Sequence, residues 1–192
     1  MRIIFVRHGE SEHNVRQSAE ENTPLTQKGR RQVSALAKRL RGYRISEIYT
    51  SSLVRAKETG RIISKVIGVP VRGSFSELDE YPGTYFNLSW GRFFHKEIRK
   101  RLKALKGLLS NISRNKNQDK IILIVAHGVT NRMILGHFLG LNSGKELLRF
   151  HQENACLNIL NWKEEFNNWS ANCLNDIEHL PKNLRSEDTL RK

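Results

Sequence analysis

Two histidines and two arginines of this sequence lie in polar segments that each follow a predicted β-strand. The three segments are Arg-His-Gly-Glu-Ser at 7–11, Ser-Ser-Leu-Val-Arg at 51–55 and Ala-His-Gly at 126–128. If the three strands are parallel, their carboxyl ends meet at one edge of the sheet. We therefore expect the two histidines and the two arginines to lie together in one site.

These residue types are suited to phosphate chemistry. Arginine stays protonated and presents a planar fork of donors that matches phosphate oxygens. Neutral imidazole is a good nucleophile near pH 7. Gly9 and Gly128 allow the backbone to approach a ligand closely. Because transfer of a phosphoryl group depends on positioning and on stabilisation of negative charge, the four side chains predict a phosphoryl-transfer site.

The elements that hold these segments alternate between strand and helix along the chain. The predicted strands are 3–6, 45–49, 69–71, 121–125, 155–160 and 168–174. The predicted helices are 26–41, 53–67, 92–109 and 130–139, and residues 74–91 are expected to be irregular. This order predicts an α/β fold, a three-layer sandwich with a mainly parallel sheet flanked by helices.

The composition is that of a soluble globular protein. Of 192 residues, 38% are hydrophobic, enough for a core, and 27% are charged. We expect a single domain over residues 1–180, with a basic helical insertion at about 74–118, and a frayed charged tail over 181–192. The longest apolar run, 121–126, is far shorter than the roughly 18 residues of a membrane span, and no secretory signal precedes Arg7. The sequence thus predicts a cytoplasmic protein without membrane contact.

The net charge of +14 favours anionic partners. Residues 91–120 hold ten Lys or Arg against two Asp or Glu, and this stretch is compatible with a basic rim around an anionic substrate, a nucleic-acid patch or a solvated helix face. Nucleic acid is disfavoured because Phe93 and Phe94 adjoin the charges rather than interleave with them.

The predicted basic helix has an apolar stripe that we expect to face the body of the protein, with its cations directed outward. The stripe comprises Phe94, Ile98, Leu102, Leu105 and Leu109, and the cations are Lys96, Arg99, Lys100, Lys103 and Lys106.

Four motifs, taken in order, resemble those of the histidine phosphatase superfamily, the phosphoglycerate-mutase-like clan. They are Arg7-His8-Gly9-Glu10-Ser11 with Asn14, then Leu25-Thr26-x-x-Gly29-x-x-Gln32, then Ser51-Ser52-Leu53-x-Arg55-Ala56-x-x-Thr59, then Ala126-His127-Gly128. The resemblance extends to about residue 175, and it implies the fold of that clan.

The resemblance also implies roles for these residues. His8 would be the nucleophile that becomes phosphorylated, and the phosphoryl oxygens would be held by Arg7, Arg55 and His127, with Asn14 assisting. The other residues expected to line the substrate are Ser11, Gly9, Gly128 and Thr26. The family uses no metal or other cofactor, and the sequence has no evident metal-ligand cluster.

The family further requires a carboxylic acid that protonates the leaving oxygen and then activates water. The candidates are Glu77, Asp79 and Glu80. We choose Glu80, with Glu77 second, because Leu78-Asp79-Glu80 followed by Pro82-Gly83 fits the L-x-E pattern of many members. The sequence of this segment differs from the motif that is more common in the family.

The resemblance favours hydrolysis of phosphomonoesters through phosphohistidine, because mutases of this type resemble longer chains with segments that exclude water. The alternatives are a phosphoglycerate-type phosphomutase and a protein phosphohistidine phosphatase. A more remote one is a non-catalytic basic binding module, which would be expected to lack a core residue. The expected partner is a small phosphorylated metabolite; the substrate and the oligomeric state stay open.

Overall fold

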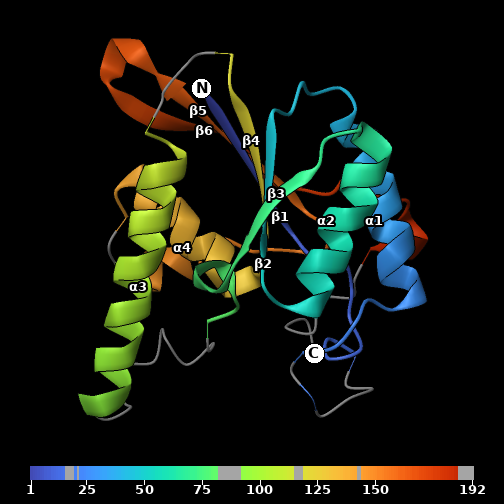
Figure 1. The fold of residues 1–192 in the computed structure, drawn as a ribbon, viewed down its shortest axis with the longest axis horizontal. Helices are drawn as coiled ribbons and strands as arrows, with labels where there is room; N and C mark the ends of the chain where they lie inside the picture. The colour runs from blue at the N-terminus through green and yellow to red at the C-terminus, as the bar shows by residue number, and fades with distance from the viewer. Residues whose placement is uncertain (16–19, 21, 82–91, 115–118, 142–143, 186–192) are drawn as a thin grey trace.

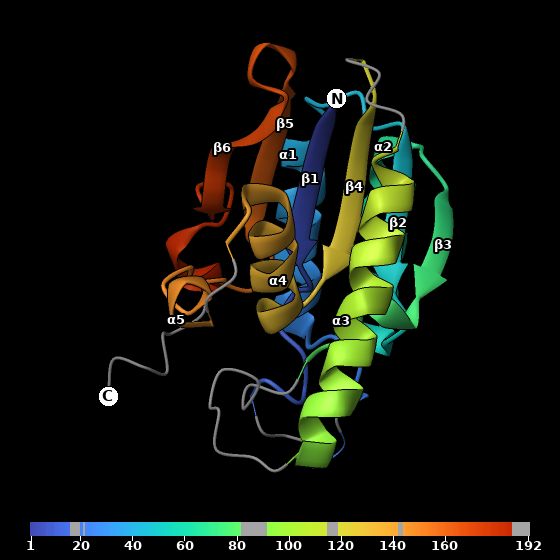
Figure 2. The same cartoon turned by 90° about the vertical axis from the view of Figure 1, so that its left-hand side faces the viewer.

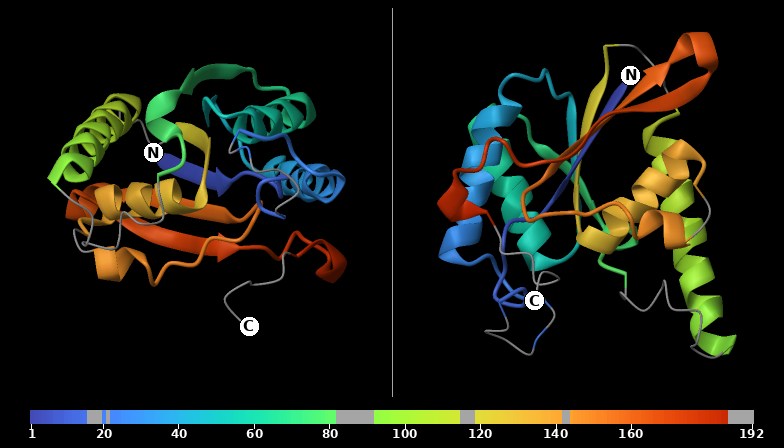
Figure 3. Two further views of the ribbon diagram at one scale, coloured as in Figure 1. Left: turned by 90° about the horizontal axis from the view of Figure 1, so that it is seen from below. Right: turned by 180° about the vertical axis from the view of Figure 1, so that it is seen from behind.

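A computed structural model of the chain describes residues 1–15, 20, 22–81, 92–114, 119–141 and 144–185; within these ranges the side chains of 92–98 and 144–145 are not described. In this part of the chain, six strands form one mixed sheet in the order β3-β2-β4-β1-β5-β6 (Figure 2). The strands are β1 (Arg2–Arg7), β2 (Glu47–Ser51), β3 (Val71–Phe75), β4 (Ile121–Ala126), β5 (Leu157–Lys163) and β6 (Asn168–Asp176). The first four are parallel, and β5 and β6 form an antiparallel hairpin beside β1 (Figure 3).

Helices cover both faces of this sheet (Figures 1 and 2). One face carries α1 (Gln27–Leu40) and α2 (Val54–Ile67), and the other carries α3 (Arg92–Ile112) and α4 (Gly128–Leu139). The shorter elements are α5 (Gly144–Leu147) and the 3-10 turns η1 (Ser76–Leu78), η3 (Glu164–Phe166) and η4 (Lys182–Leu184). The three-layer α/β architecture predicted from the sequence is confirmed.

Two apolar cores follow from the alternation of side chains along β1. Ile3 and Phe5 pack with α3 and α4, whereas Ile4 and Val6 pack with α1 and α2. All four side chains are fully buried. Strands buried on both faces carry continuous apolar runs, and this is why the sequence predicts β1 and β4 clearly.

The strands that precede the polar segments end side by side. The parallel register pairs Arg7 of β1 with Ala126 of β4, and it pairs Thr50 of β2 with Val125 of β4. The segments that follow therefore leave the sheet at the same edge, as the sequence predicted.

Three strand predictions were displaced along the chain. β5 runs over 157–163 rather than 155–160, because Ala155 has a φ of 56° and the antiparallel pairing with β1 and β6 begins at Leu157. β3 runs over 71–75 rather than 69–71, so it includes the start of the segment expected to be irregular. Gly73 and Ser74 have weak strand propensity, but parallel pairing with β2 holds them in the sheet. β2 runs over 47–51 rather than 45–49, since it pairs with β4 as far as Thr50 and with β3 as far as Ser51.

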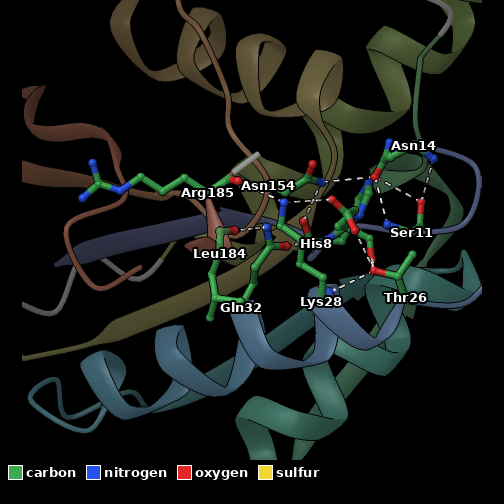
Figure 4. A network of polar contacts seen from close by, with 11 residues as sticks. His8, Ser11, Asn14, Thr26, Lys28, Gln32, Asn154, Leu184 and Arg185 are labelled. Atoms are coloured by element: carbon green, nitrogen blue, oxygen red, sulfur yellow. Dashed lines mark hydrogen bonds and ion pairs between the residues drawn. The ribbon is translucent and has the colours of Figure 1, made fainter. Parts of the chain in front are cut away.

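The first residues of the predicted charged tail are held against α1 rather than frayed. Leu184 is buried, and its carbonyl oxygen accepts a hydrogen bond of 2.6 Å from Nε2 of Gln32 (Figure 4). The Arg185 carbonyl accepts from Lys28 at 3.0 Å. Burial of Leu184 and these bonds oppose fraying, while residues 186–192 lie outside the described part.

The basic helix α3 presents the expected faces where its side chains are described. Leu105 and Leu109 are buried and Leu102 packs against them. The exposed cations are Arg99, Lys100, Lys103 and Lys106. The predictions for Phe94, Lys96 and Ile98 fall outside the described side chains. In the described ranges, no helix has the length and apolar character that crossing a bilayer requires.

Candidate active site

His8 lies at the carboxyl end of β1 and is held in one orientation by its backbone and its ring. Its N–H donates to the Ala126 carbonyl at 3.1 Å, and its own carbonyl accepts from the backbone N–H of Ala155. Nδ1 lies 2.6 Å from the carbonyl oxygen of Gly9. Because a carbonyl only accepts, Nδ1 carries the hydrogen and Nε2 carries the lone pair.

Two arginines flank this imidazole. The buried Arg55, in the first turn of α2, donates from Nε to Nε2 of His8 at 3.1 Å. Arg7, the last residue of β1, donates from Nη1 to the Gln152 carbonyl at 2.6 Å. The Nε atom of Arg7 is buried without a hydrogen-bond partner in the described part of the chain. A buried donor of this kind is rare in a folded protein, so a ligand oxygen is the natural partner.

His127 completes the cluster from the end of β4. Its ring centroid lies 4.9 Å from that of His8, with the two planes 61° apart. Its Nε2 is 2.7 Å from Oγ of Ser51, which ends β2. Side chains from the ends of three parallel strands thus meet as the sequence predicted.

Both imidazoles are uncharged at neutral pH in this environment. Burial lowers the pKa of His8 well below the usual histidine value, and His127, Arg7 and Arg55 lower it further. Burial also lowers the pKa of His127 well below that value, with Arg55 and Arg7 as the further causes. Each ring therefore keeps one nitrogen lone pair.

Glu80 lies beside the cluster and caps the start of α4. Its Oε1 accepts the backbone N–H groups of Val129 at 3.0 Å and Thr130 at 3.3 Å. Burial raises the pKa of this carboxyl, although Arg7, the two N–H groups and Arg55 act in the opposite direction. A raised pKa suits a group that must donate a proton near neutral pH.

Glu77 lies three residues before Glu80, in the turn η1, where its carboxylate contacts Oγ of Ser76 at 3.4 Å. Together with Asp79 and Glu80 it lines a cavity of about 440 Å³ whose opposite wall is α3. The cations of that wall are Lys100 and Arg101. The anchoring of Glu80 on α4, beside the two arginines, favours Glu80 over Glu77 as the acid.

The loop after β1 positions Asn14 (Figure 4). Oδ1 of Asn14 accepts from the backbone N–H and the hydroxyl of Ser11, each at 3.1 Å, and from Nδ2 of Asn154 at 3.2 Å. Asn154 also donates to the His8 carbonyl at 3.2 Å. These bonds fix the orientation of the Asn14 side chain, and they occupy Ser11 in holding Asn14.

Three residues expected near the substrate have packing or capping contacts. A Cβ on Gly9 would lie 2.6 Å from the Gly29 carbonyl oxygen, so Gly9 permits close packing of the site loop on α1. Thr26 caps α1 by accepting the Gly29 N–H at 3.0 Å, and it donates to the Glu10 carboxylate at 2.8 Å. A Cβ on Gly128 would make only ordinary contact with Arg7, at 3.6 Å.

The sequence reasoning missed several residues that hold the cluster in place. Asp79 was weighed only as an acid, but its carboxylate accepts hydrogen bonds from both Ser51 and Ser52. Gln152 and Asn154 were not considered, yet they hold Arg7 and His8 through the bonds given above. The polar run His-Gln-Glu-Asn at 151–154, directly before a buried strand, was the signal for them. Among the described residues, no group of three His, Cys, Asp or Glu side chains is arranged to hold a metal ion.

A family model decides the relationship. The model of the histidine phosphatase superfamily (branch 1) matches residues 3–88 and 95–177. The chain belongs to this superfamily. Relatives over nearly the whole length include a probable phosphoglycerate mutase of Photorhabdus laumondii, 26% identical over 94% of this chain and 95% of the relative. An uncharacterized phosphatase of Bacillus subtilis is 28% identical over 93% of this chain and 96% of the relative.

Solved structures of similar fold include two phosphatases. A mutant phosphoserine phosphatase from Entamoeba histolytica, in complex with phosphoserine, has a TM-score of 0.72 and 21% identity, and the match covers 94% of this chain and 99% of that one. A mycobacterial glucosyl-3-phosphoglycerate phosphatase has a TM-score of 0.71 and 21% identity, over 91% of this chain and 98% of that one. At this identity the likeness shows the shared fold.

Proposed function

We propose that this superfamily member is a phosphatase that hydrolyses small phosphomonoesters through a phosphohistidine at His8, without a metal. The observation that carries the proposal is the state of the His8 ring. It is buried and neutral, its Nδ1–H is fixed by the Gly9 carbonyl, and its Nε2 lone pair lies against Arg55. A lone pair held beside arginine donors is suited to attack on a phosphoryl group that those donors bind.

In the first step, Nε2 of His8 attacks phosphorus as the P–O bond to the leaving group breaks. The phosphoryl oxygens compete for the donors of Arg55 and so free the lone pair, while Arg7 and His127 stabilise the spread negative charge. Glu80 gives its proton to the leaving oxygen. In the second step, Glu80 takes a proton from water, which attacks phosphorus and breaks the P–N bond. Inorganic phosphate leaves, and His8 and Glu80 return to their starting states.

The decisive experiment combines removal of the nucleophile with detection of the intermediate. A panel of phosphorylated metabolites is screened for phosphate release, and His8→Ala is expected to abolish release from every substrate found. Rapid quenching of the wild type with labelled substrate should trap an adduct that is labile in acid and stable in base. Unchanged turnover in His8→Ala would show the mechanism to be wrong.

A phosphoglycerate-type mutase is the second candidate, because one of the full-length relatives is named a probable phosphoglycerate mutase. A mutase returns the phosphoryl group of His8 to a second hydroxyl of the substrate instead of to water. The two functions are separated by following 3-phosphoglycerate by NMR. A phosphatase gives glycerate and inorganic phosphate, whereas a mutase gives 2-phosphoglycerate with little free phosphate.

A further inference from the structure

We propose that Asp79 is a positioning residue of this site, which acts through Ser51 to fix His127 in the tautomer whose Nδ1 has the lone pair. We further infer that the Asp79 carboxylate supports the positive charge that His127 acquires when a phosphoryl group binds. The second part rests on the proposed function, whereas the first concerns the free protein.

The tautomer follows from the number of hydrogens in the chain of contacts. Ser51 has one hydroxyl hydrogen, and the Asp79 carboxylate, 2.7 Å away, can only accept it. The Ser51 oxygen must then accept a hydrogen from Nε2 of His127, which lies 2.7 Å away on its other side. A neutral His127 therefore has its hydrogen on Nε2 and a lone pair on Nδ1.

Asp79 is itself held in place by further hydrogen bonds, and these also fix the orientation of the Ser51 hydroxyl that it accepts. Its two carboxylate oxygens accept the Ser52 backbone N–H at 2.8 Å and the Ser52 hydroxyl at 2.7 Å. Its carbonyl oxygen accepts from the Thr130 hydroxyl at 2.9 Å. Asp79 thus connects the end of β2 to the start of α4, the helix that follows His127. An anchored carboxylate fixes its partner hydroxyl in a way that a solvated one does not.

The opposite nitrogen of His127 is where a ligand is expected. Nδ1 is buried and has no hydrogen-bond partner in the described part of the chain, as is also true of Nε of the neighbouring Arg7. A lone pair at Nδ1 would repel a phosphoryl oxygen, since both only accept. Binding of a dianionic phosphoryl group therefore requires one proton from solvent at Nδ1, which then donates to the phosphoryl oxygen.

The charges around His127 decide whether this proton is held. Arg55 from α2 and Arg7 from β1 act on the charge of His127, and the His8 ring lies 4.9 Å from its ring. Asp79 reaches His127 through Ser51, and Glu80 accepts the backbone N–H of Val129, two residues after His127. Without a ligand, burial and the two arginines keep the pKa of His127 low. A bound phosphoryl dianion raises the pKa of His127, because its negative charge lies on the Nδ1 side of the ring. The Asp79–Ser51 pair stabilises the imidazolium from the Nε2 side.

The first test reads the tautomer directly in the free, full-length protein. Long-range ¹H–¹⁵N NMR spectra of the histidine rings, assigned with a His127→Gln sample, are expected to show His127 with its hydrogen on Nε2. In Ser51→Ala the preference for this tautomer should be reduced. A wild-type His127 with its hydrogen on Nδ1 would overturn the proposal, whether or not the protein proves to be a phosphatase.

The second test measures binding of inorganic phosphate by calorimetry as a function of pH. Asp79→Asn keeps an oxygen acceptor for Ser51 but removes the charge, so we expect binding weakened about tenfold and its upper pH limit lowered by about one unit. Ser51→Ala should have a similar effect. The variant with both substitutions should bind phosphate no more weakly than either single variant, because both act on the same interaction. The matched control, Ser52→Ala, removes one anchor of Asp79 and keeps the charge.

The outcomes separate the two proposals. A shift of the pH limit in Asp79→Asn and Ser51→Ala, but not in Ser52→Ala, supports the role of the carboxylate charge. An equal shift in all three, or weaker binding with an unchanged pH limit, would mean that Asp79 only shapes the loop, and the inference would be wrong. If the wild type does not bind phosphate at all, the proposed function fails, and the tautomer still decides the role of Asp79.

Discussion

Replacement of Glu80 by glutamine isolates the proton that this residue is proposed to exchange. The amide keeps an oxygen for the N–H groups of Val129 and Thr130, which lie 3.0 and 3.3 Å from Oε1, so the start of α4 should stay capped. Only acid–base chemistry is lost. General acid catalysis contributes about 10²–10⁴-fold to a rate. That factor corresponds to about 2.7–5.4 kcal/mol in the activation barrier, at about 1.36 kcal/mol for each tenfold.

The assay compares two substrates that differ in their need for this proton. For an alkyl phosphate, kcat/KM of Glu80→Gln should fall by about 10²–10⁴. For p-nitrophenyl phosphate, whose phenolate leaves without protonation, kcat/KM should change little. Its kcat should still fall, because water attack on phosphohistidine needs Glu80 as a base. Stopped-flow traces should therefore show a burst of p-nitrophenol followed by slow turnover.

The pH profile provides an independent check on the same residue. Because burial raises the pKa of Glu80, its acid form persists to higher pH than that of an exposed glutamate. The alkaline limb of kcat/KM for the alkyl ester should disappear in Glu80→Gln. Glu77→Gln is the matched control and should leave both substrates and the profile unchanged. An equal loss of kcat/KM on both substrates, or a selective loss in Glu77→Gln, would refute the assignment.

Four further outcomes are expected. Gly9→Ala should lower the free energy of unfolding by about 1–3 kcal/mol in urea titrations, since its Cβ would lie 2.6 Å from a carbonyl oxygen of α1; an unchanged midpoint would contradict this. Activity should survive EDTA, and a rate that collapses and returns with a divalent ion would exclude the metal-free mechanism. Because burial depresses the pKa of His8 and His127, protonation favours the unfolded chain, so the melting temperature should fall as pH drops below about 6.5 and phosphate should oppose the fall; a flat profile would contradict this. Reversing the exposed Lys100 and Lys103 to Glu should lower kcat/KM for a multiply charged ester more than for p-nitrophenyl phosphate, and less so at high salt; an equal response would leave α3 a solvated face.

The sequence by itself determined the central strands and the residues at their ends. β1 and β4 are buried on both faces, so their apolar runs carry the signal without knowledge of their neighbours. Parallel strands place their carboxyl ends at one edge, and this rule is sufficient to predict that His8, Arg55 and His127 lie together. The start of α1 and the end of α2 were also predictable from the sequence, because Thr26 caps α1 and Gly68 ends α2 with a φ of 75°.

Only the tertiary structure decided the edge of the sheet and the electrostatic state of the site. β3 has weak propensity and exists because β2 pairs with it. The choice between Glu80 and Glu77, and the role of Asp79, depend on which N–H and hydroxyl groups face each carboxylate. Three acidic residues close together in one segment are alike in sequence, but burial and hydrogen bonding from α4 and β2 give each a different environment. Such contacts between distant segments set pKa values and tautomers, and local sequence patterns do not contain them.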